Sequence, residues 1–171
     1  DRIQKLSGED KDEYQGLRTG YSLLDTYISG LNKPDLIIVA GRPGMGKSAF
    51  AFNIASNVAK RNPDKDVCIF SLEMSKEQIA TRMLSSEALV PNTSLTSGMI
   101  SSDEWVQLAQ AADTLSQVNI YIDDTAGITV PQMKAKLRRM RNLGLVIIDY
   151  LQLMESATNH TSRVNEVSEI T

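Results

Sequence analysis

The sequence contains very little cysteine and histidine, and this scarcity excludes several classes of site. Its 171 residues include one cysteine, Cys68, and one histidine, His160. A single cysteine cannot close an internal disulfide, and these two residues cannot form a Cys/His zinc site. Cys68 lies inside an apolar run, so we interpret it as a small core residue of a cytoplasmic protein.

Long hydrophobic runs are absent as well. No stretch of about 18 apolar residues occurs, and the first residues do not show the pattern of a signal peptide. We therefore expect a cytoplasmic protein with no membrane contact.

The sequence also lacks an excess of positive charge. It carries 18 Lys and Arg against 21 Asp and Glu, which gives a net charge of −3. Nucleic-acid-binding domains usually show a basic footprint, so local loops or a ring of subunits would have to supply one here. The basic run at residues 134–141 surrounds an apolar stripe, which favours a solvated helix face over a nucleic-acid surface.

Apolar runs and helical periodicity are present, and they alternate along the chain. Runs typical of strands occupy residues 35–41, 67–72, 118–124 and 145–148, and helical patterns occupy 47–61, 76–89, 101–115 and 129–141. This order predicts an α/β fold with a mainly parallel sheet flanked by helices. The run "DLIIVAG" at 35–41 has no polar alternation, so we expect a strand buried on both faces.

The segment "GRPGMGKS", Gly41–Ser48, fits the P-loop pattern G-x-x-x-x-G-K-[ST] between an expected strand and an expected helix. Glycines let the backbone wrap closely, so that amide N–H groups and the helix N-terminus face the phosphates of a nucleotide. Lys47 adds a positive charge there, and Ser48 offers a hydroxyl to Mg²⁺. The expected nucleotide-binding residues are Gly41, Arg42, Pro43, Gly44, Met45, Gly46, Lys47, Ser48 and Ala49.

Two carboxylates follow expected strands. Asp149 ends "LVIID" and would lie at the carboxyl edge of a parallel sheet, where it is positioned to hold Mg²⁺ through a water; its alternative role is to cap the next turn. Glu73 follows the strand at 67–72 and is the best candidate for the base that orients and deprotonates the attacking water. From spacing alone, an ordinary first-turn acid favoured by the helix dipole is equally compatible with Glu73.

The chain resembles the motor domain of replicative DnaB-type helicases from Gly16 onward. The resemblance is carried, in this order, by "GLRTGYSLLD", "LIIVAGRPGMGKSAFAFNIA", "IFSLEMS", "IYIDDT", "IIDYLQLM" and "NEVSEI". It implies a RecA-like P-loop NTPase fold, with Glu73 as the catalytic glutamate, Lys47 and Ser48 on phosphate and Mg²⁺, and Asp149 on the metal. The implied cofactors are ATP and Mg²⁺.

The family also implies partners and further segments. Its members form homo-hexamers that move from 5′ to 3′ along single-stranded DNA, and they work with a primase and a helicase loader. Residues 1–15 correspond to the linker arm, and 16–171 to the N-terminal part of the ATPase motor domain. The family's phosphate-sensing glutamine, DNA-gripping loop and arginine finger would lie beyond Thr171, so we expect these 171 residues alone to fold poorly and hydrolyse ATP slowly.

The sequence therefore predicts an ATP-driven DNA helicase motor domain. A RecA/RadA-like recombinase shares the P-loop and both carboxylates, but "SLEMS" and "DYLQLM" argue against it. A nucleotide-binding regulatory module without turnover is the other alternative, and the presence of Glu73 disfavours it.

Overall fold

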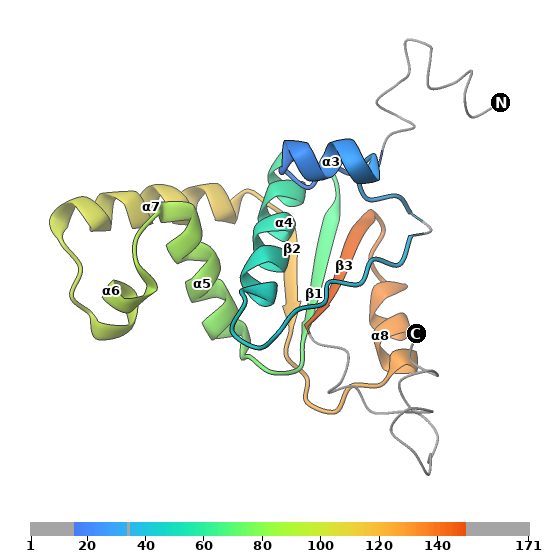
Figure 1. Cartoon of the computed structure of the whole chain (residues 1–171). Helices are drawn as coiled ribbons and strands as arrows, with labels where there is room; N and C mark the ends of the chain where they lie inside the picture. The colour runs from blue at the N-terminus through green and yellow to red at the C-terminus, as the bar shows by residue number, and fades with distance from the viewer. Residues whose placement is uncertain (1–15, 34, 150–171) are drawn as a thin grey trace.

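The computed structural model describes residues 16–33 and 35–149, which form a small sheet with helices on both faces (Figure 1). Within these ranges no helix is both long and apolar enough to cross a bilayer. The expected arm at 1–15 and the residues after Asp149 lie outside the described residues. The elements are α3 (Ser22–Ile28), α4 (Lys47–Arg61), β1 (Asp66–Ser71), α5 (Lys76–Ala88), α6 (Asn92–Ser97), α7 (Ser102–Ser116), β2 (Ile120–Asp123), α8 (Val130–Leu137) and β3 (Leu143–Asp149).

The sheet is parallel, as the sequence predicts, with β1 between β2 and β3. Phe70 pairs with Asp123 on β2, and Ser71 pairs with Asp149 on β3. The carboxyl ends of all three strands therefore meet at one edge of the sheet. In Figure 1, α4 begins at the end of the molecule where these strands finish.

The central strand β1 supplies the core on both faces of the sheet. Val67 and Ile69 pack with residues of α4 and α5, whereas Cys68 and Phe70 pack with Ile128 and residues of α8. Burial raises the pKa of the Cys68 thiol to about 11, to which the nearby Asp123 charge also contributes. The thiol is therefore neutral at physiological pH, and Cys68 is the buried core residue that the sequence predicts.

Helices α5, α6 and α7 extend away from the sheet around a second, smaller core (Figure 1). Leu108 and Ala111 of α7 are buried against Ala88 and Val90 at the end of α5. Trp105 lies three residues before Leu108, the spacing of one helix face, but its side chain is 60% exposed. Leu108 and Ala111 supply the buried face of α7 instead, and Leu115 near its end packs against the main core.

Local capping signals set the starts of three helices. Ser75 starts α5 with a capping box to Gln78, and Thr129 starts α8 with a capping box to Gln132. Ser101 starts α7 in the same way. These caps satisfy backbone N–H groups that have no partner within the helix.

The expected strand at 35–41 is wrong for this structure. The segment forms no strand, and four of its apolar side chains are exposed: Leu36 by 70%, Ile37 by 50%, Ile38 by 69% and Val39 by 47%. A strand needs a neighbour that accepts and donates ladder hydrogen bonds. Within the described residues no strand pairs with this segment, and β3 is also unpaired along its outer edge.

Candidate nucleotide-binding and catalytic site

The loop that leads into α4 has a backbone that only glycine adopts without strain. Gly44 has φ +76° and Gly46 has φ +80°, both in the left-handed region. A Cβ atom on either residue would meet no heavy atom within 4 Å, so backbone conformation and not space requires glycine here. Gly46 is the N-cap of α4, so this turn aims the free amides at the start of the helix outward.

Lys47 lies over this loop. Its Nζ donates to the carbonyl oxygens of Gly41 at 3.0 Å and Arg42 at 3.2 Å. A Cβ on Gly41 would lie 3.6 Å from the methylene groups of Lys47, so the lysine stem covers that glycine closely. The remaining predicted loop residues are half-buried or exposed: Ser48 is half-buried, and Arg42, Pro43, Met45 and Ala49 are exposed.

Asp149 is buried at the end of β3. The residue is 7% exposed, and its Oδ2 atom has no hydrogen-bond partner among the described residues. A buried oxygen without a partner destabilises the folded chain, unless a bound cation or a hydrogen-bond donor interacts with it. Its backbone carbonyl accepts a hydrogen bond of 2.8 Å from the amide of Leu72. The end of β3 is thereby joined to the turn that follows β1.

Glu73 lies in that turn, one residue beyond Leu72. Its side chain is exposed, and among the described residues it has neither a hydrogen bond nor an ion pair. The Ser71–Asp149 pairing and the Leu72–Asp149 hydrogen bond bring the Glu73 turn and Asp149 together at one sheet edge. Within the described ranges no hydrogen bond or ion pair joins either carboxylate to Lys47 or Ser48, although α4 packs on both β1 and β3.

The donor set fits a magnesium ion held partly by a nucleotide. The described residues contain no cluster of three or more His, Cys, Asp and Glu side chains that could hold a metal by themselves. Mg²⁺ commonly takes one or two protein oxygens and completes its shell with phosphates and water. The orphaned Oδ2 of Asp149 and the hydroxyl of Ser48 are donors of that kind.

Two residues that sequence reasoning missed hold the Glu73 turn. The Ser71 hydroxyl bonds both the amide and the carbonyl of Met74, and its position two residues before Glu73 was a usable signal. Asp124 accepts a hydrogen bond from the Lys76 amide, 48 residues away in sequence. Nothing in the sequence around Asp124 indicates this distant contact.

Comparisons with known proteins agree with this arrangement. The chain is 50% identical over 161 residues to the replicative DNA helicase DnaB of Synechocystis sp., covering 91% of this chain and 18% of that protein. It is 45% identical over 174 residues to the replicative DNA helicase DnaC of Bacillus subtilis, covering 99% of this chain and 38% of that protein. The chain thus spans well under half the length of these two relatives.

Solved structures show the same fold. One, described as a DnaB-like replicative helicase and its interactions with primase, superposes with a TM-score of 0.83 at 31% identity over 91% of this chain and 38% of its own. A second, described as an ATPase domain, gives 0.84 at 32% identity over 91% of this chain and 56% of its own. The fold is therefore RecA-like. The profile of the DnaB-like helicase C-terminal domain matches residues 16–171, and the chain belongs to that family.

Proposed function

We propose that this chain is the motor domain of a replicative DNA helicase, which couples ATP hydrolysis to 5′-to-3′ movement along single-stranded DNA and to duplex unwinding. The observation that carries the proposal is the connection between the carboxyl ends of β1 and β3 at one edge of the sheet. There the Leu72 amide bonds the Asp149 carbonyl at 2.8 Å, so the candidate base and the candidate metal ligand share one backbone connection. Hydrolysis of a triphosphate needs both functions at one place.

The phosphate-binding role falls to residues 41–49. The left-handed glycines and the start of α4 present backbone amides to an anion, which the helix dipole also favours. The Lys47 ammonium lies over the same loop and would exchange its carbonyl partners for phosphate oxygens. In this role Lys47 stabilises the charge that develops on the transferred phosphate.

Ser48 and Asp149 would hold the magnesium ion that accompanies ATP. When bound, Mg²⁺ would neutralise part of the negative charge of the phosphates. The Asp149 carboxylate has a buried oxygen without a hydrogen-bond donor among the described residues, so a bound cation would compensate it. The Ser48 hydroxyl, in the first turn of α4, would supply the second protein oxygen.

Glu73 would act on the attacking water. Its exposed carboxylate is free of hydrogen bonds and ion pairs within the described residues, so it can accept a proton from a water molecule. The Leu72–Asp149 hydrogen bond ties the turn that carries Glu73 to the strand end that bears Asp149. Glu73 would orient the water and remove its proton as the bond to phosphorus forms.

The proposed partners follow from the relatives. Both named relatives are replicative DNA helicases, and one solved neighbour is described with its interactions with primase. We infer single-stranded DNA, a homo-hexamer, a primase and a helicase loader for the full-length protein. The net charge of −3 is compatible with this, because a ring needs only a few phosphate contacts from each subunit.

Glu73→Gln in the full-length protein tests the proposal. The amide keeps the size of the side chain but cannot act as a base, so nucleotide binding should persist while hydrolysis falls by about 10²–10⁴-fold. Phosphate release with and without single-stranded DNA measures hydrolysis, and titration with fluorescent ATP measures binding. A forked DNA substrate should be unwound by the wild type and not by the variant.

Three outcomes would contradict the proposal. Near-normal turnover in Glu73→Gln would show that another group is the base. Strand exchange without fork unwinding by the wild type would indicate a recombinase. ATP binding in Mg²⁺ without DNA-stimulated phosphate release by the wild type would indicate a regulatory module.

A further inference from the structure

The turn that carries Glu73 is closed by a residue at the end of β1. The Ser71 hydroxyl donates to the Met74 carbonyl at 2.7 Å and accepts from the Met74 amide at 3.1 Å. Ser71 is 2% exposed, so water does not compete for these bonds. The backbone on either side of Glu73 is thereby held in one small ring.

A second bond reaches the same turn from a different strand. Asp124, which follows β2, accepts a hydrogen bond of 3.0 Å through Oδ2 from the amide of Lys76, the first residue of α5. The start of α5 already has its own capping box, made by Ser75 and Gln78. Helices α7 and α8 also begin with capping boxes, and no distant side chain bonds their first amide within the described residues. The Asp124 bond therefore fixes where α5 begins relative to the sheet.

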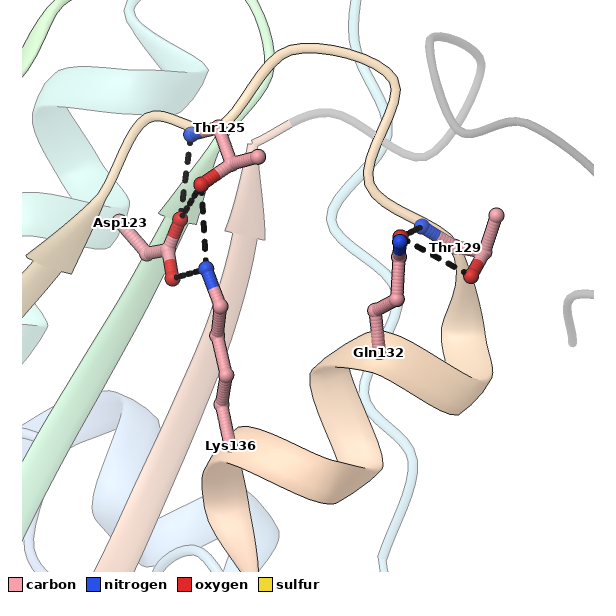
Figure 2. A network of polar contacts seen from close by, with 5 residues as sticks. All are labelled: Asp123, Thr125, Thr129, Gln132 and Lys136. Atoms are coloured by element: carbon pink, nitrogen blue, oxygen red, sulfur yellow. Dashed lines mark hydrogen bonds and ion pairs between the residues drawn. The ribbon is translucent and has the colours of Figure 1, made fainter.

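The loop that carries Asp124 is itself fixed on both sides. Asp123 Oδ1 accepts from the amide of Thr125 at 3.1 Å and from its hydroxyl at 2.6 Å. Figure 2 shows Lys136 reaching from α8 to the Asp123 carboxylate and to the Thr125 hydroxyl, which is 3.0 Å away. Asp124 lies between these two anchored residues, so α8 and β2 together hold its backbone.

The Asp123 carboxylate, which holds this loop to α8, stays charged at neutral pH. Burial acts to raise the pKa of Asp123, but the hydrogen bonds from Lys136 and Thr125 outweigh it and hold the pKa below its ordinary value. Asp123 therefore stays ionised opposite the Lys136 ammonium. The ion pair maintains the shape of the loop in the pH range in which the enzyme would work.

We propose that Asp124 is a positioning residue for Glu73. By holding the first amide of α5, it sets the turn at residues 72–75 against the sheet edge and keeps the Glu73 carboxylate at a fixed distance from Asp149. The inference rests on the proposed function, since it requires Glu73 to act on the water. A misplacement of about 1 Å can cost about 10²-fold in rate, so a small shift of this turn would be visible in kcat.

Asp124→Ala in the full-length protein tests this role. The variant should lower kcat for ATP hydrolysis by about 10–100-fold, while nucleotide affinity stays unchanged because residues 41–49 are not touched. Asp124→Asn keeps an acceptor oxygen for the Lys76 amide and should restore most of the rate. Lys136→Met frees the loop from α8 and should lower kcat by a smaller factor, again with unchanged nucleotide affinity. This variant provides the test if Asp124→Ala does not fold.

Ser101→Ala is the matched control, because it removes a helix cap from α7 at a distance from the Glu73 turn. It should lower thermal stability without changing kcat. The inference is overturned if Asp124→Ala and Lys136→Met keep a normal kcat, or if Asp124→Ala loses kcat and nucleotide affinity together. If Glu73→Gln itself retains hydrolysis, the proposed function fails; if it loses hydrolysis while Asp124→Ala stays normal, only the positioning role fails.

Discussion

Lys47 shows how one side chain can be prepared for a ligand. Its ammonium is held by two carbonyl oxygens of the loop, those of Gly41 and Arg42. Both carbonyls are neutral, so a phosphate oxygen would be a stronger partner for the same ammonium. The side chain therefore has little conformational freedom to lose when it binds an anion.

Lys47→Ala should weaken nucleotide binding. Hydrogen bonds to charged groups contribute about 1.5–3 kcal/mol, so the dissociation constant for fluorescent ATP should rise by about 10–100-fold. Lys65→Ala is the matched control, because among the described residues Lys65 pairs with the exposed Asp64 and should not affect binding. Unchanged affinity in Lys47→Ala would count against the phosphate-binding role of the loop.

At the scale of elements, the glycine at the start of α4 both caps the helix and belongs to the predicted nucleotide-binding loop. Gly46 caps the helix with φ +80°, and Gly98 caps the end of α6 with φ +73°. A Cβ on either glycine would have open space around it. The two sites therefore require the same left-handed conformation, one in the predicted nucleotide-binding loop and one at the end of α6.

Gly46→Ala and Gly98→Ala should each lower the free energy of unfolding by about 1–2 kcal/mol, because an L-residue resists the left-handed conformation. Urea denaturation measures this cost. Nucleotide affinity should fall only in Gly46→Ala, whose loop must relax away from the shape that faces the phosphates. An equal loss of affinity in both variants would show that the effect is one of general stability.

The elements with local signals were the most predictable from sequence. The expected helix at 47–61 has the bounds of α4, and the capping boxes at Ser75 and Thr129 set the starts of α5 and α8. Periodicity, caps and the proline at the first turn of α8 act within a few residues, so the sequence contains them in full.

Features that depend on distant partners were less predictable. Residues 35–41 have the composition of a buried strand, but composition does not provide a neighbour with which to pair. Trp105 fits a helical stripe, yet the surface offered by α5 and α6 decides which side of α7 is covered. For the site, the P-loop and both carboxylates follow from motifs, whereas the bond from Asp124 to Lys76 depends on the packing of β2 beside β1.

On the scale of the whole molecule, two features favour association: the exposed apolar segment 36–39 and the outer edge of β3, which has no strand partner among the described residues. Unpaired strand edges take up other chains through backbone hydrogen bonds, and a charged residue on such an edge opposes this. A further strand would find backbone partners on the outer edge of β3.

The 171-residue chain in isolation should therefore self-associate, and Ile38→Lys should reduce the association. Light scattering at several protein concentrations would measure the mean mass. Val106→Lys changes a similarly exposed apolar residue on α7 and serves as the control. If the two substitutions reduce the mean mass equally, the association is non-specific. If only Val106→Lys reduces it, the chains associate through α7.

The single backbone bond between Leu72 and Asp149 limits how the site can deform. Any movement that separates the Glu73 turn from the end of β3 must break this bond of 2.8 Å. Residues 36–40, in contrast, make no backbone hydrogen bond within the described part of the chain, so they can shift without such a loss. The approach to the glycine loop is therefore the more compliant part of the site, and the joined ends of β1 and β3 are the stiffer part.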